Sequence, residues 1–528
     1  MDDVAVVPSK DNLEKNTRTV WSITLLSRFA GLGRDAAISR YFGAGAVSSA
    51  FFFAFLLPNL ARRLFGEGAL SAAFVPAYTK LLDESPERAK ALASLTIARL
   101  IMLLGGVVLV GELLLWILLW CSPSTDGLFG LMMIMLPYMP LVCVVAILGG
   151  ILQTHGRFGP TAAAPIILNA CMIAGTILFA GVFVEVTHHM MLVGVGVVVA
   201  GVLQVAWSFH ALRKTSWWSR ETDCGKEDFK MMVRKLIPTI IGLGTMQLNT
   251  FLDGLIASYP ILIGATIFGV AYPLGEGANA SLNFAARLYQ FPLGVFGIAV
   301  GTAIFPLLAS LATNREEFGN TLRRGLRLVV FIGLPASAGL MLVRDILSGV
   351  VYQGGLFTSS DTTEVGFILL GYGTAIWAYS MTQVLIRAFY AVDDIRTPVK
   401  IAVRIVALNL ILNMLLIWTP LGTAGLAWST AFCAVVQVCI LMRVIRKHVD
   451  VPADRAVVRS WMKTTFATFA MSIGVWGAVT YCPDVVNLSW WESLGILTIC
   501  VGVGILVFGI CVHFLGMEER KWIFGSRG

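Results

Sequence analysis

Long apolar runs alternate with short polar loops along almost the whole chain. A helix needs about 20 apolar residues to cross the hydrocarbon core of a bilayer. The second and eighth runs are long enough to bend, and each contains a proline (Pro58, Pro292) at which a kink is expected. In total the pattern predicts fourteen membrane-spanning helices, at 20–42, 48–79, 95–120, 130–153, 161–184, 189–212, 233–258, 279–311, 326–351, 364–391, 398–418, 422–444, 461–481 and 489–515.

Composition supports a polytopic membrane protein. The 528 residues are 57% hydrophobic and 13% charged, whereas a soluble domain carries about 25% charged residues. The net charge of +8 does not predict a nucleic-acid partner, because the basic residues cluster in alternate loops, which is a signal of membrane topology. No cleavable signal peptide is expected, since residues 1–19 are polar and mixed in charge.

The loop charges also predict the orientation. One set of alternate loops carries the Lys and Arg residues, and by the positive-inside rule these loops and both termini are cytoplasmic. Segment 259–278 is apolar and rich in Gly and Pro, which leaves an interfacial or re-entrant outer segment or a fifteenth span as alternatives; the charge alternation argues against the span. The loops without Lys or Arg lie around 43–47, 121–129, 185–188, 259–278, 352–363, 419–421 and 482–488.

No enzyme active site or metal site is evident in the sequence. The nine cysteines include no CxxC pair and no cluster at metal-ligand spacing. Cys121 and Cys482 both fall near predicted outer ends, so a disulfide between them is an alternative to two free thiols. The histidines form no metalloprotease signature, and there is no P-loop, nucleophile elbow or dinucleotide fingerprint. The protein is therefore predicted not to be an enzyme.

An internal repeat suggests two related lobes. Gln204-Val205 precedes Arg213-Lys214 just as Gln437-Val438 precedes Arg446-Lys447, and Leu168-Asn169 resembles Leu408-Asn409 in the same order. Six spans per unit is an even number, so the two units run in the same direction, related by an axis along the membrane normal. The predicted divisions are a cytoplasmic segment (1–19), an N-lobe (20–214), a linker (215–232), a C-lobe (233–447) and a C-terminal helix pair with a cytoplasmic tail (448–528).

The predicted fold is thus an all-α polytopic membrane protein, with two six-helix lobes related by a pseudo-twofold axis plus two C-terminal helices. Transporters use this plan, with a substrate site between the lobes near the middle of the membrane. Several arginines lie within apolar sequence of the predicted spans, and five of them are singled out here: Arg28, Arg34, Arg62, Arg63 and Arg287. A lone arginine at bilayer depth costs roughly 2.5–3.5 kcal/mol on insertion scales. The set therefore predicts a wet cavity with an anionic ligand.

The guanidinium groups favour a particular ligand. Each group stays charged and binds phosphate oxygens in a bidentate fork, so a pyrophosphate headgroup suits the set. Ser27 and Asn59 adjoin the arginines and are assigned to the same substrate site. Arg63 and Glu67 are four residues apart and are expected to pair, which leaves Arg62 freer for a ligand. The alternative, snorkelling or a private ion pair, is preferred for Arg40, for Arg344 beside Asp345, and for Arg387.

A second polar set consists of Asp253, Asn409 and Asn413. Asn409 and Asn413 share a helix face, and Ser429 or Thr430 is placed to join them. Oxygen ligands around one carboxylate suit a small hard cation or a proton, so Na⁺ or H⁺ is the expected coupling ion, with no other cofactor and no firm metal site. The alternative is interhelical hydrogen bonding that only stabilises packing.

Four segments resemble a known family. They are SRFAGLGRDAAISRYFGAG, AFFFAFLLPNLARRLFGEGALSAAFVPAY, ARLYQFPLGVFGIAVGTAIFP and FYAVDDIRTPVKIA. They resemble the MurJ (MviN) family of bacterial lipid II flippases, within the multidrug/oligosaccharidyl-lipid/polysaccharide exporter superfamily, and the resemblance covers nearly the whole chain. It implies a flippase for peptidoglycan biosynthesis, cell wall biogenesis and cell shape. Such a protein moves lipid II, an undecaprenyl-pyrophosphate lipid, from the cytoplasmic to the outer leaflet of the inner membrane by alternating access, and is expected to function as a monomer.

The resemblance also implies roles for individual residues. Arg28, Arg34, Arg62 and Arg287 match the family's central-cavity arginines, and Glu67 matches an acid of that cavity. Asp253 and Asn409 resemble members of a sodium site described for some relatives. The chain lacks a charge at four positions where the family often or in some members carries one: Ser49, Leu56, Ala286 and Asn413.

Three other functions remain as alternatives. A drug exporter or polysaccharide-lipid exporter of the same superfamily would need fewer clustered arginines. A membrane scaffold that recruits wall-synthesis enzymes without transporting anything would tolerate their loss. A membrane-embedded transferase would need a catalytic His or an acid pair in the cavity, which the sequence does not supply.

Overall fold

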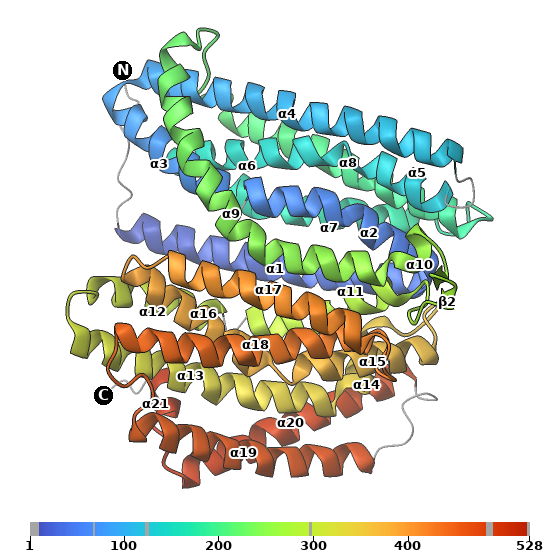
Figure 1. Cartoon of the computed structure of the whole chain (residues 1–528), viewed down its shortest axis with the longest axis vertical. Helices are drawn as coiled ribbons and strands as arrows, with labels where there is room; N and C mark the ends of the chain where they lie inside the picture. The colour runs from blue at the N-terminus through green and yellow to red at the C-terminus, as the bar shows by residue number, and fades with distance from the viewer. Residues whose placement is uncertain (1–9, 67–68, 122–125, 295–297, 482–488, 525–528) are drawn as a thin grey trace. The chain divides into compact units, whose positions relative to one another are not determined.

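The chain folds into two compact units, residues 1–280 and 281–528. The computed structural model describes residues 10–66, 69–121, 126–294, 298–481 and 489–524. Almost all of this described part is helical, as Figure 1 shows. Since a helix satisfies its backbone hydrogen bonds within one segment, it is the form expected of apolar runs in lipid.

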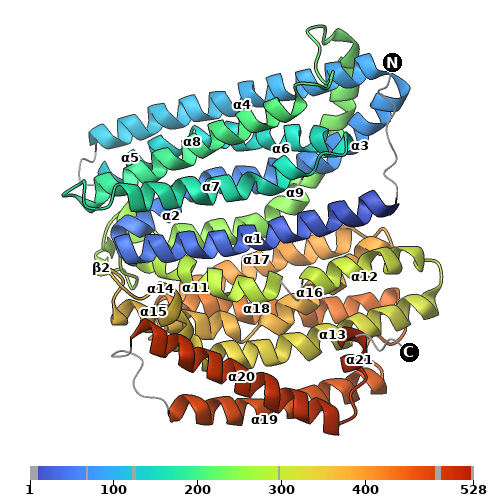
Figure 2. The same cartoon turned by 180° about the vertical axis from the view of Figure 1, so that it is seen from behind.

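The helices of unit 1 pack against one another in several pairs. Helix α7 packs against both α1 and α8, as seen from behind in Figure 2. The π-helical turn η1 packs against α2, α3, α6 and α9. The elements are α1 (Lys10–Phe42), α2 (Ala46–Ala61), η1 (Arg62–Gly66), α3 (Ala69–Glu84), α4 (Pro86–Cys121), α5 (Asp126–Met135), α6 (Tyr138–Thr154), α7 (Gly159–Leu178), α8 (Val186–Leu212), η3 (Asp223–Gly225), α9 (Lys226–Ala257), α10 (Tyr259–Leu262), β1 (Thr266–Ile267) and β2 (Val270–Ala271).

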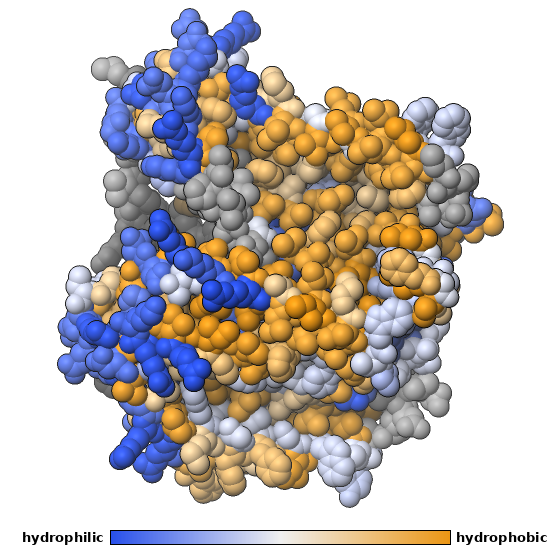
Figure 3. All heavy atoms as spheres, in the orientation of Figure 1, coloured by the Kyte–Doolittle hydropathy of each residue, from blue (hydrophilic) through white to orange (hydrophobic). Residues whose placement is uncertain are grey.

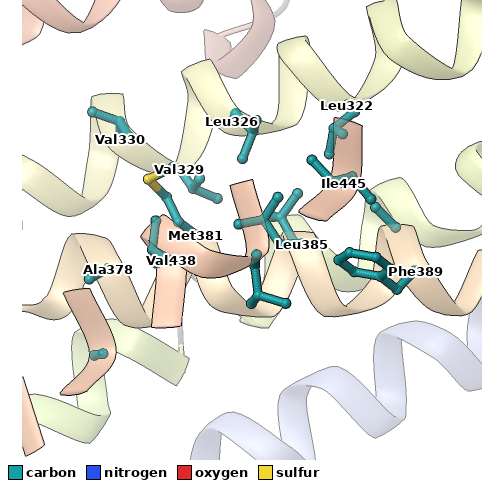
Figure 4. Packing of buried hydrophobic residues seen from close by; sticks show 14 of the residues in the cluster. Leu322, Leu326, Val329, Val330, Ala378, Met381, Leu385, Phe389, Val438 and Ile445 are labelled. Carbon is teal, nitrogen blue, oxygen red and sulfur yellow. The ribbon is translucent and has the colours of Figure 1, made fainter. Parts of the chain in front are cut away.

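Unit 2 begins within α11 (Ala278–Pro292), which crosses the boundary between the units. Its largest described core joins α13, α16 and α18, where Leu326, Met381 and Val438 are buried side by side (Figure 4). Such interdigitated side chains gain many small dispersion contacts. The remaining elements are α12 (Ile298–Ser310), α13 (Arg315–Leu342), α14 (Arg344–Tyr352), α15 (Ser359–Gly373), α16 (Ile376–Ala391), α17 (Arg396–Leu416), α18 (Ala424–Val444), η5 (Ile445–Lys447), α19 (Arg455–Thr480), α20 (Trp490–Phe514) and α21 (Glu519–Phe524).

Helix covers most of each of the fourteen predicted apolar runs. Within the described residues, eight helices are long and apolar enough to cross a membrane by themselves, and nine if the pair α15–α16, bent by 43°, counts as one span. Other runs divide into shorter helices, as α2–η1–α3 and α11–α12 do. The count of fourteen crossings and the symmetry of two lobes stay predictions.

Both long runs lose regular α-helix near their prolines. Pro292 is the last α-helical residue of α11 and π-helical residues 293–294 follow it, so the kink expected there stays a prediction. Pro58 lies inside α2, and the regular helix continues through it to Ala61 before the π-helical turn Arg62–Gly66 begins. The interruption therefore follows Pro58 by about one turn, and it places two of the singled-out arginines at the irregular backbone.

Segment 259–278 is not a fifteenth span. It forms the short helix α10 and the two-stranded hairpin β1–β2. Phe268 and Gly269 connect the strands with φ angles of 49° and 81°, the positive values that a tight type I′ hairpin requires. The side chain of Phe268 is fully exposed. The span alternative is wrong, because Gly and Pro break the apolar run into turns.

Hydrophilic side chains gather at one end of each unit (Figure 3). In unit 1 they surround the starts of α4 and α9, where Arg88 and Lys226 lie, and in unit 2 the start of α17, where Arg396 and Lys400 lie. Such segregation accompanies a positive-inside topology. The orientation of the termini stays a prediction.

The compact units divide the chain differently from the sequence repeat. Helix α9 belongs to unit 1, where it packs against α2, α3 and α4, whereas the repeat assigns its apolar part to the second lobe. The two divisions describe different properties, contacts in one case and internal similarity in the other. The predicted lobe boundaries stay a prediction.

Candidate functional site

Arg34 is held in a buried polar network between α1 and α7. The residue is 6% exposed. Its Nε and Nη2 atoms donate hydrogen bonds to Asp35 Oδ1 at 2.8 and 2.6 Å, and its Nη1 donates to Asn169 Oδ1 at 3.1 Å. Asn169 Nδ2 in turn donates to the carbonyl of Ser27 at 3.3 Å. Asp35 thus neutralises the charge of Arg34 where it is buried, and a contact of Arg34 with substrate stays a prediction.

Arg28 has different surroundings on the same helix. Its side chain is half-buried and makes no hydrogen bond or ion pair with any residue that the structure describes. Arg28 and Arg34 are six residues apart, roughly 600° of rotation, and so point about 120° apart on the continuous helix α1. Asp35 and Asn169 therefore serve only one of the two arginines.

Arg62 and Arg63 begin the π-helical turn η1. Arg62 donates from Nε and Nη2 to Asn59 Oδ1 at 3.2 and 2.9 Å, and Arg63 Nη1 donates to Gln247 Oε1 of α9 at 3.0 Å. Asn59 and Gln247 are neutral amides, and these contacts orient the two guanidinium groups. Short π-helical segments occur frequently at functional sites, and this one places both arginines beside α6 and α9.

Three residues that the sequence assigned to a pair, a disulfide or the substrate site lie outside the described residues or in unit 2. Glu67 and Cys482 fall outside the described residues, so the Arg63–Glu67 pair stays a prediction and the Cys482 disulfide an open alternative. Arg287 lies on α11 within unit 2, where it is half-buried. Close to it in sequence, Tyr289 stacks on Tyr372 with ring centroids 4.4 Å apart. The convergence of Arg287 with the arginines of unit 1 stays a prediction.

The second polar set is divided between the units. In unit 2, Asn413 Nδ2 donates to Asn409 Oδ1 at 3.0 Å, and Asn409 Nδ2 donates at 3.3 Å to the hydroxyls of both Ser429 and Thr430. The Ser429 hydroxyl donates to Asn413 Oδ1. The expected participation of Ser429 and Thr430 is confirmed. This network joins α17 to α18, as interhelical hydrogen bonds do.

Asp253 belongs to unit 1 and is buried on α9. It accepts a hydrogen bond at 3.2 Å from Asn249 Nδ2, one helical turn earlier. Among the described residues, no group of three or more His, Cys, Asp and Glu side chains is arranged to hold a metal ion. Its participation in a cation site with Asn409 and Asn413 stays a prediction.

Ser49 and Leu56, two of the four positions at which this chain lacks a charge that relatives carry, make close packing contacts. Ser49 is fully buried; its hydroxyl accepts from the Ala280 backbone N–H at 3.0 Å and its carbonyl accepts from Asn279 Nδ2 at 3.1 Å. Leu56 lies against Gly254, where an added Cβ would come within 2.9 Å of its Cδ2 atom. These contacts fit an apolar or neutral side chain at each position.

The local pairs expected for other arginines are partly found. Arg344 and Asp345 lie 3.4 Å apart, which confirms that pair. Arg387 Nη2 donates to the hydroxyl of Thr302 at 3.1 Å. Arg40 is exposed in the last turn of α1.

Sequence reasoning missed three polar residues. Asn169 entered it only as part of a repeat match, and Gln247 did not enter it at all. Glu112, within the apolar helix α4, also escaped notice; its Oε1 atom is buried and has no hydrogen-bond partner among the described residues. A scan for single polar residues inside apolar runs would have found all three.

Comparison with known proteins identifies the family. A family model described as lipid II flippase MurJ matches residues 38–493. A probable lipid II flippase MurJ of Vibrio cholerae is 30% identical over 535 residues, covering 96% of this chain and 97% of the relative. The chain belongs to the MurJ lipid II flippase family. Among its relatives, the MurJ of Burkholderia cenocepacia is 29% identical over 496 residues, covering 91% of each chain.

Solved structures extend the MurJ likeness to the fold. A lipid II flippase MurJ in an inward closed conformation matches with a TM-score of 0.76 at 23% identity, covering 96% of this chain and 99% of that one. An inward-facing MATE transporter of the MOP superfamily matches with a TM-score of 0.64 at 13% identity, covering 81% and 97%. The fold is therefore that of MurJ and MATE transporters, as the sequence resemblance implied.

Proposed function

We propose that this protein moves lipid II across the bacterial inner membrane, from the cytoplasmic to the outer leaflet. The observation that carries the proposal is membership of the MurJ family over most of the chain, with relatives named as lipid II flippases. The long apolar helices support a multi-pass membrane protein. A sugar and pyrophosphate headgroup cannot cross hydrocarbon unaided, whereas a polyprenyl tail can remain in lipid.

Among the candidate arginines, Arg28 has the surroundings that most favour binding of the anionic headgroup. Arg28 is half-buried on an apolar helix and has no partner among the residues that the structure describes. Such a guanidinium is costly in lipid, and an anionic ligand would offset that cost. Arg62 and Arg63 are each oriented by a neutral amide, and a guanidinium carries five N–H donors of the kind that bind phosphate oxygens. We propose that these three arginines bind the pyrophosphate, and that Arg34 stiffens α1 against α7 through Asp35 and Asn169.

Transport proceeds in this proposal by alternating access, with the protein acting as a monomer. The cationic site masks the charge of the headgroup during transit, and a membrane potential that is negative inside drives an anion outward. We also propose Na⁺ or H⁺ as the coupling ion, with Asp253 as its carboxylate. A flipping rate in liposomes that is insensitive to both Na⁺ and pH gradients would rule out this coupling.

The decisive test compares two arginines of one helix. A bacterium depleted of its own lipid II flippase is supplied with wild type, Arg28→Ala or Arg40→Ala, each matched for amount in the membrane. Arg40 is the control because it is exposed near the end of the same helix. Wild type and Arg40→Ala should restore growth, and Arg28→Ala should not. In liposomes the Arg28→Ala flipping rate should fall about 10- to 100-fold, as expected for losing a charged hydrogen bond.

The possible results distinguish the substrate assignment, the role of Arg28 and the scaffold alternative from one another. Failure of well-expressed wild type to rescue growth or to flip lipid II would overturn the substrate assignment. Full activity of Arg28→Ala would leave the family assignment standing and remove Arg28 from the site. A scaffold predicts that growth is restored by every variant while the liposomes show no flipping.

A further inference from the structure

Unit 1 contains a cavity that the transport proposal does not use. It has a volume of about 500 Å³ and lies between the first half of α4 and the end of α8. One wall is apolar and formed by Ile97, Ile101, Phe209 and Leu212, and Arg213 lies at its polar side. Cavities of roughly 300–1,000 Å³ are typical of small-molecule sites. This volume is sufficient for part of a membrane lipid.

The loop that follows α8 lines the cavity and is held in place by contacts with α4 and α8. The backbone N–H of Ser219 donates to the hydroxyl of Ser94 on α4 at 2.9 Å. Trp217 is 8% exposed and packs on Phe209 with ring centroids 5.7 Å apart. Trp218, in contrast, is 53% exposed and also lines the cavity. The site therefore has a fixed inner wall and an open apolar side.

Four basic side chains at or beside this site lack partners within the described part of the chain. Arg213 lines the cavity, and Lys214 follows it. Arg99 follows the lining residue Ala98, and Arg220 lies two residues after Trp218. All four basic residues are exposed, and none makes a hydrogen bond or ion pair with a residue of the described ranges.

Other basic residues at the same end of unit 1 are paired. Arg88 Nε donates to Asp228 Oδ2 at 3.0 Å, and Lys90 lies 3.0 Å from Glu87. The acid nearest in sequence to the unpaired set is Glu221, beside Arg220. The cavity thus combines an apolar wall with an excess of positive charge, which is complementary to an anion with an apolar tail.

The position of the cavity along the helices restricts its occupant. It lies where the apolar part of α4 begins and where α8 ends, at the basic and predicted cytoplasmic end. Trp and Tyr rings favour this interfacial depth, and basic pockets between helices on the cytoplasmic side bind anionic headgroups. A soluble anion would leave the apolar wall unused, and a neutral lipid would leave the cations uncompensated.

We propose that this cavity binds an anionic phospholipid of the cytoplasmic leaflet. Its phosphate contacts Arg213, and one acyl chain lies along Ile97, Ile101 and Phe209. The bound lipid fastens the 213–220 loop to α4, in addition to the contact between Ser219 and Ser94. The proposal requires a membrane protein with the predicted orientation and is independent of which headgroup is transported.

The test measures lipid binding by the purified full-length protein. Phosphatidylglycerol or phosphatidylcholine is titrated onto delipidated protein, and occupancy is read by native mass spectrometry alongside the thermal midpoint. Phosphatidylglycerol should bind about tenfold more tightly, and Arg213→Gln should remove that preference. The matched control is Arg446→Gln, since Arg446 occupies the repeat-related position, is exposed and has no partner among the described residues.

A second variant distinguishes lipid binding in the cavity from nonspecific electrostatic attraction to the basic surface. Ala98→Phe fills the apolar wall while the net charge stays unchanged, and it should weaken phosphatidylglycerol binding with Arg213 intact. If this variant fails to fold, Arg213→Gln at an exposed position still tests the site. Preserved binding in a folded Ala98→Phe variant would overturn the proposal.

Four other outcomes would also overturn the proposal. They are equal affinity for the two phospholipids, an equal loss in Arg213→Gln and Arg446→Gln, the same protection by inorganic phosphate alone, and occupancy by undecaprenyl phosphate in preference to phosphatidylglycerol. The last would make the cavity a substrate entrance. Flipping assays are a separate readout, so lipid II transport by wild type can succeed while this proposal fails.

Discussion

Two groups of basic residues, one in each unit, differ in whether acidic side chains pair with them. At the basic end of unit 2, arginines of α13 are tied to acids of the C-terminal region: Arg315 to Asp450 at 3.0 Å, Arg323 to Asp454 at 3.3 Å, and Arg327 to Glu518 and Glu519 at 3.0 and 2.7 Å. At the basic end of unit 1, a group of similar size has no such partners in the described structure: Arg99, Arg213, Lys214 and Arg220. Positive charge by itself therefore does not distinguish a structural clamp from a ligand site.

The same contrast occurs within a single helix. On α1, Arg34 is buried against Asp35, whereas Arg28 has no described partner. A buried paired charge contributes to the fold, and removing its partner is expensive. An unpaired charge in an apolar helix contributes little to the fold and is available to a ligand. Stability measurements should therefore separate the two groups.

The largest effect is expected for Asp35→Ala. The substitution leaves the Arg34 guanidinium buried without its acid, which should lower the free energy of unfolding by about 3–5 kcal/mol. Unfolding in detergent, followed by circular dichroism, measures the loss. The control is the double variant Arg34→Met/Asp35→Leu, which removes both charges and should recover much of the stability. A single variant as stable as wild type would show that Arg34 is not held by this pair.

A smaller effect is expected for Glu519→Gln in unit 2. Glu519 is 1% exposed and accepts hydrogen bonds from Arg327 Nε at 2.7 Å and from the Ser460 hydroxyl at 2.5 Å. Losing the charge should lower the free energy of unfolding by about 1.5–3 kcal/mol. Arg315→Gln is the comparison, because its exposed ion pair should contribute less than about 1 kcal/mol.

The pair of Glu519 and Arg327 also predicts that the free energy of unfolding depends on pH. Burial alone would raise the pKa of Glu519, but hydrogen bonds from Ser460 and Arg327 outweigh it and hold the pKa below its ordinary value. The stabilisation is therefore present above the unfolded-state pKa of about 4.3 and is lost as the pH falls through the lower folded-state value. The stability difference between wild type and Glu519→Gln should shrink over that range. A constant difference would contradict the assignment.

The sequence predicts the helices better than it predicts their interactions. Apolar runs locate the helices because burial in lipid depends on local composition. The pairing of Arg34 with Asn169 joins residues 135 positions apart, and no local pattern encodes it. The sequence also did not predict the hairpin at Phe268-Gly269, since a bulky residue with positive φ is uncommon. For the candidate site, sequence identified the arginines, and only the structure distinguishes those with partners.

A modest effect is expected for Asn413→Ala. The variant removes hydrogen bonds to Asn409 and from Ser429, and such interhelical bonds in membranes contribute about 0.6–1.7 kcal/mol. Thr430→Val, at the edge of the same network, should cost less. Thermal unfolding with and without Na⁺ distinguishes the two interpretations of this set. Stabilisation by Na⁺ that disappears in Asn413→Ala would favour a cation site over simple interhelical bonding.

The smallest stability effect is expected for Arg28→Gln. Because this guanidinium has no partner among the described residues, its removal deprives no buried group of a hydrogen bond, and the free energy of unfolding should change by less than about 0.5 kcal/mol. Arg34→Gln on the same helix should be clearly destabilising, since it leaves the carboxylate of Asp35 buried without its cation.

Equal destabilisation by the two substitutions would mean that Arg28 has an acid partner in the folded protein, and the contrast within α1 would then be lost. The predicted combination for Arg28→Gln is normal stability with defective transport. That combination identifies a residue whose charge serves to bind a ligand. Replacing a side chain that is needed only for folding would not impair transport while the fold stays intact. Adding lipid II should then raise the thermal midpoint of wild type more than that of Arg28→Gln, since a ligand stabilises only the form that binds it.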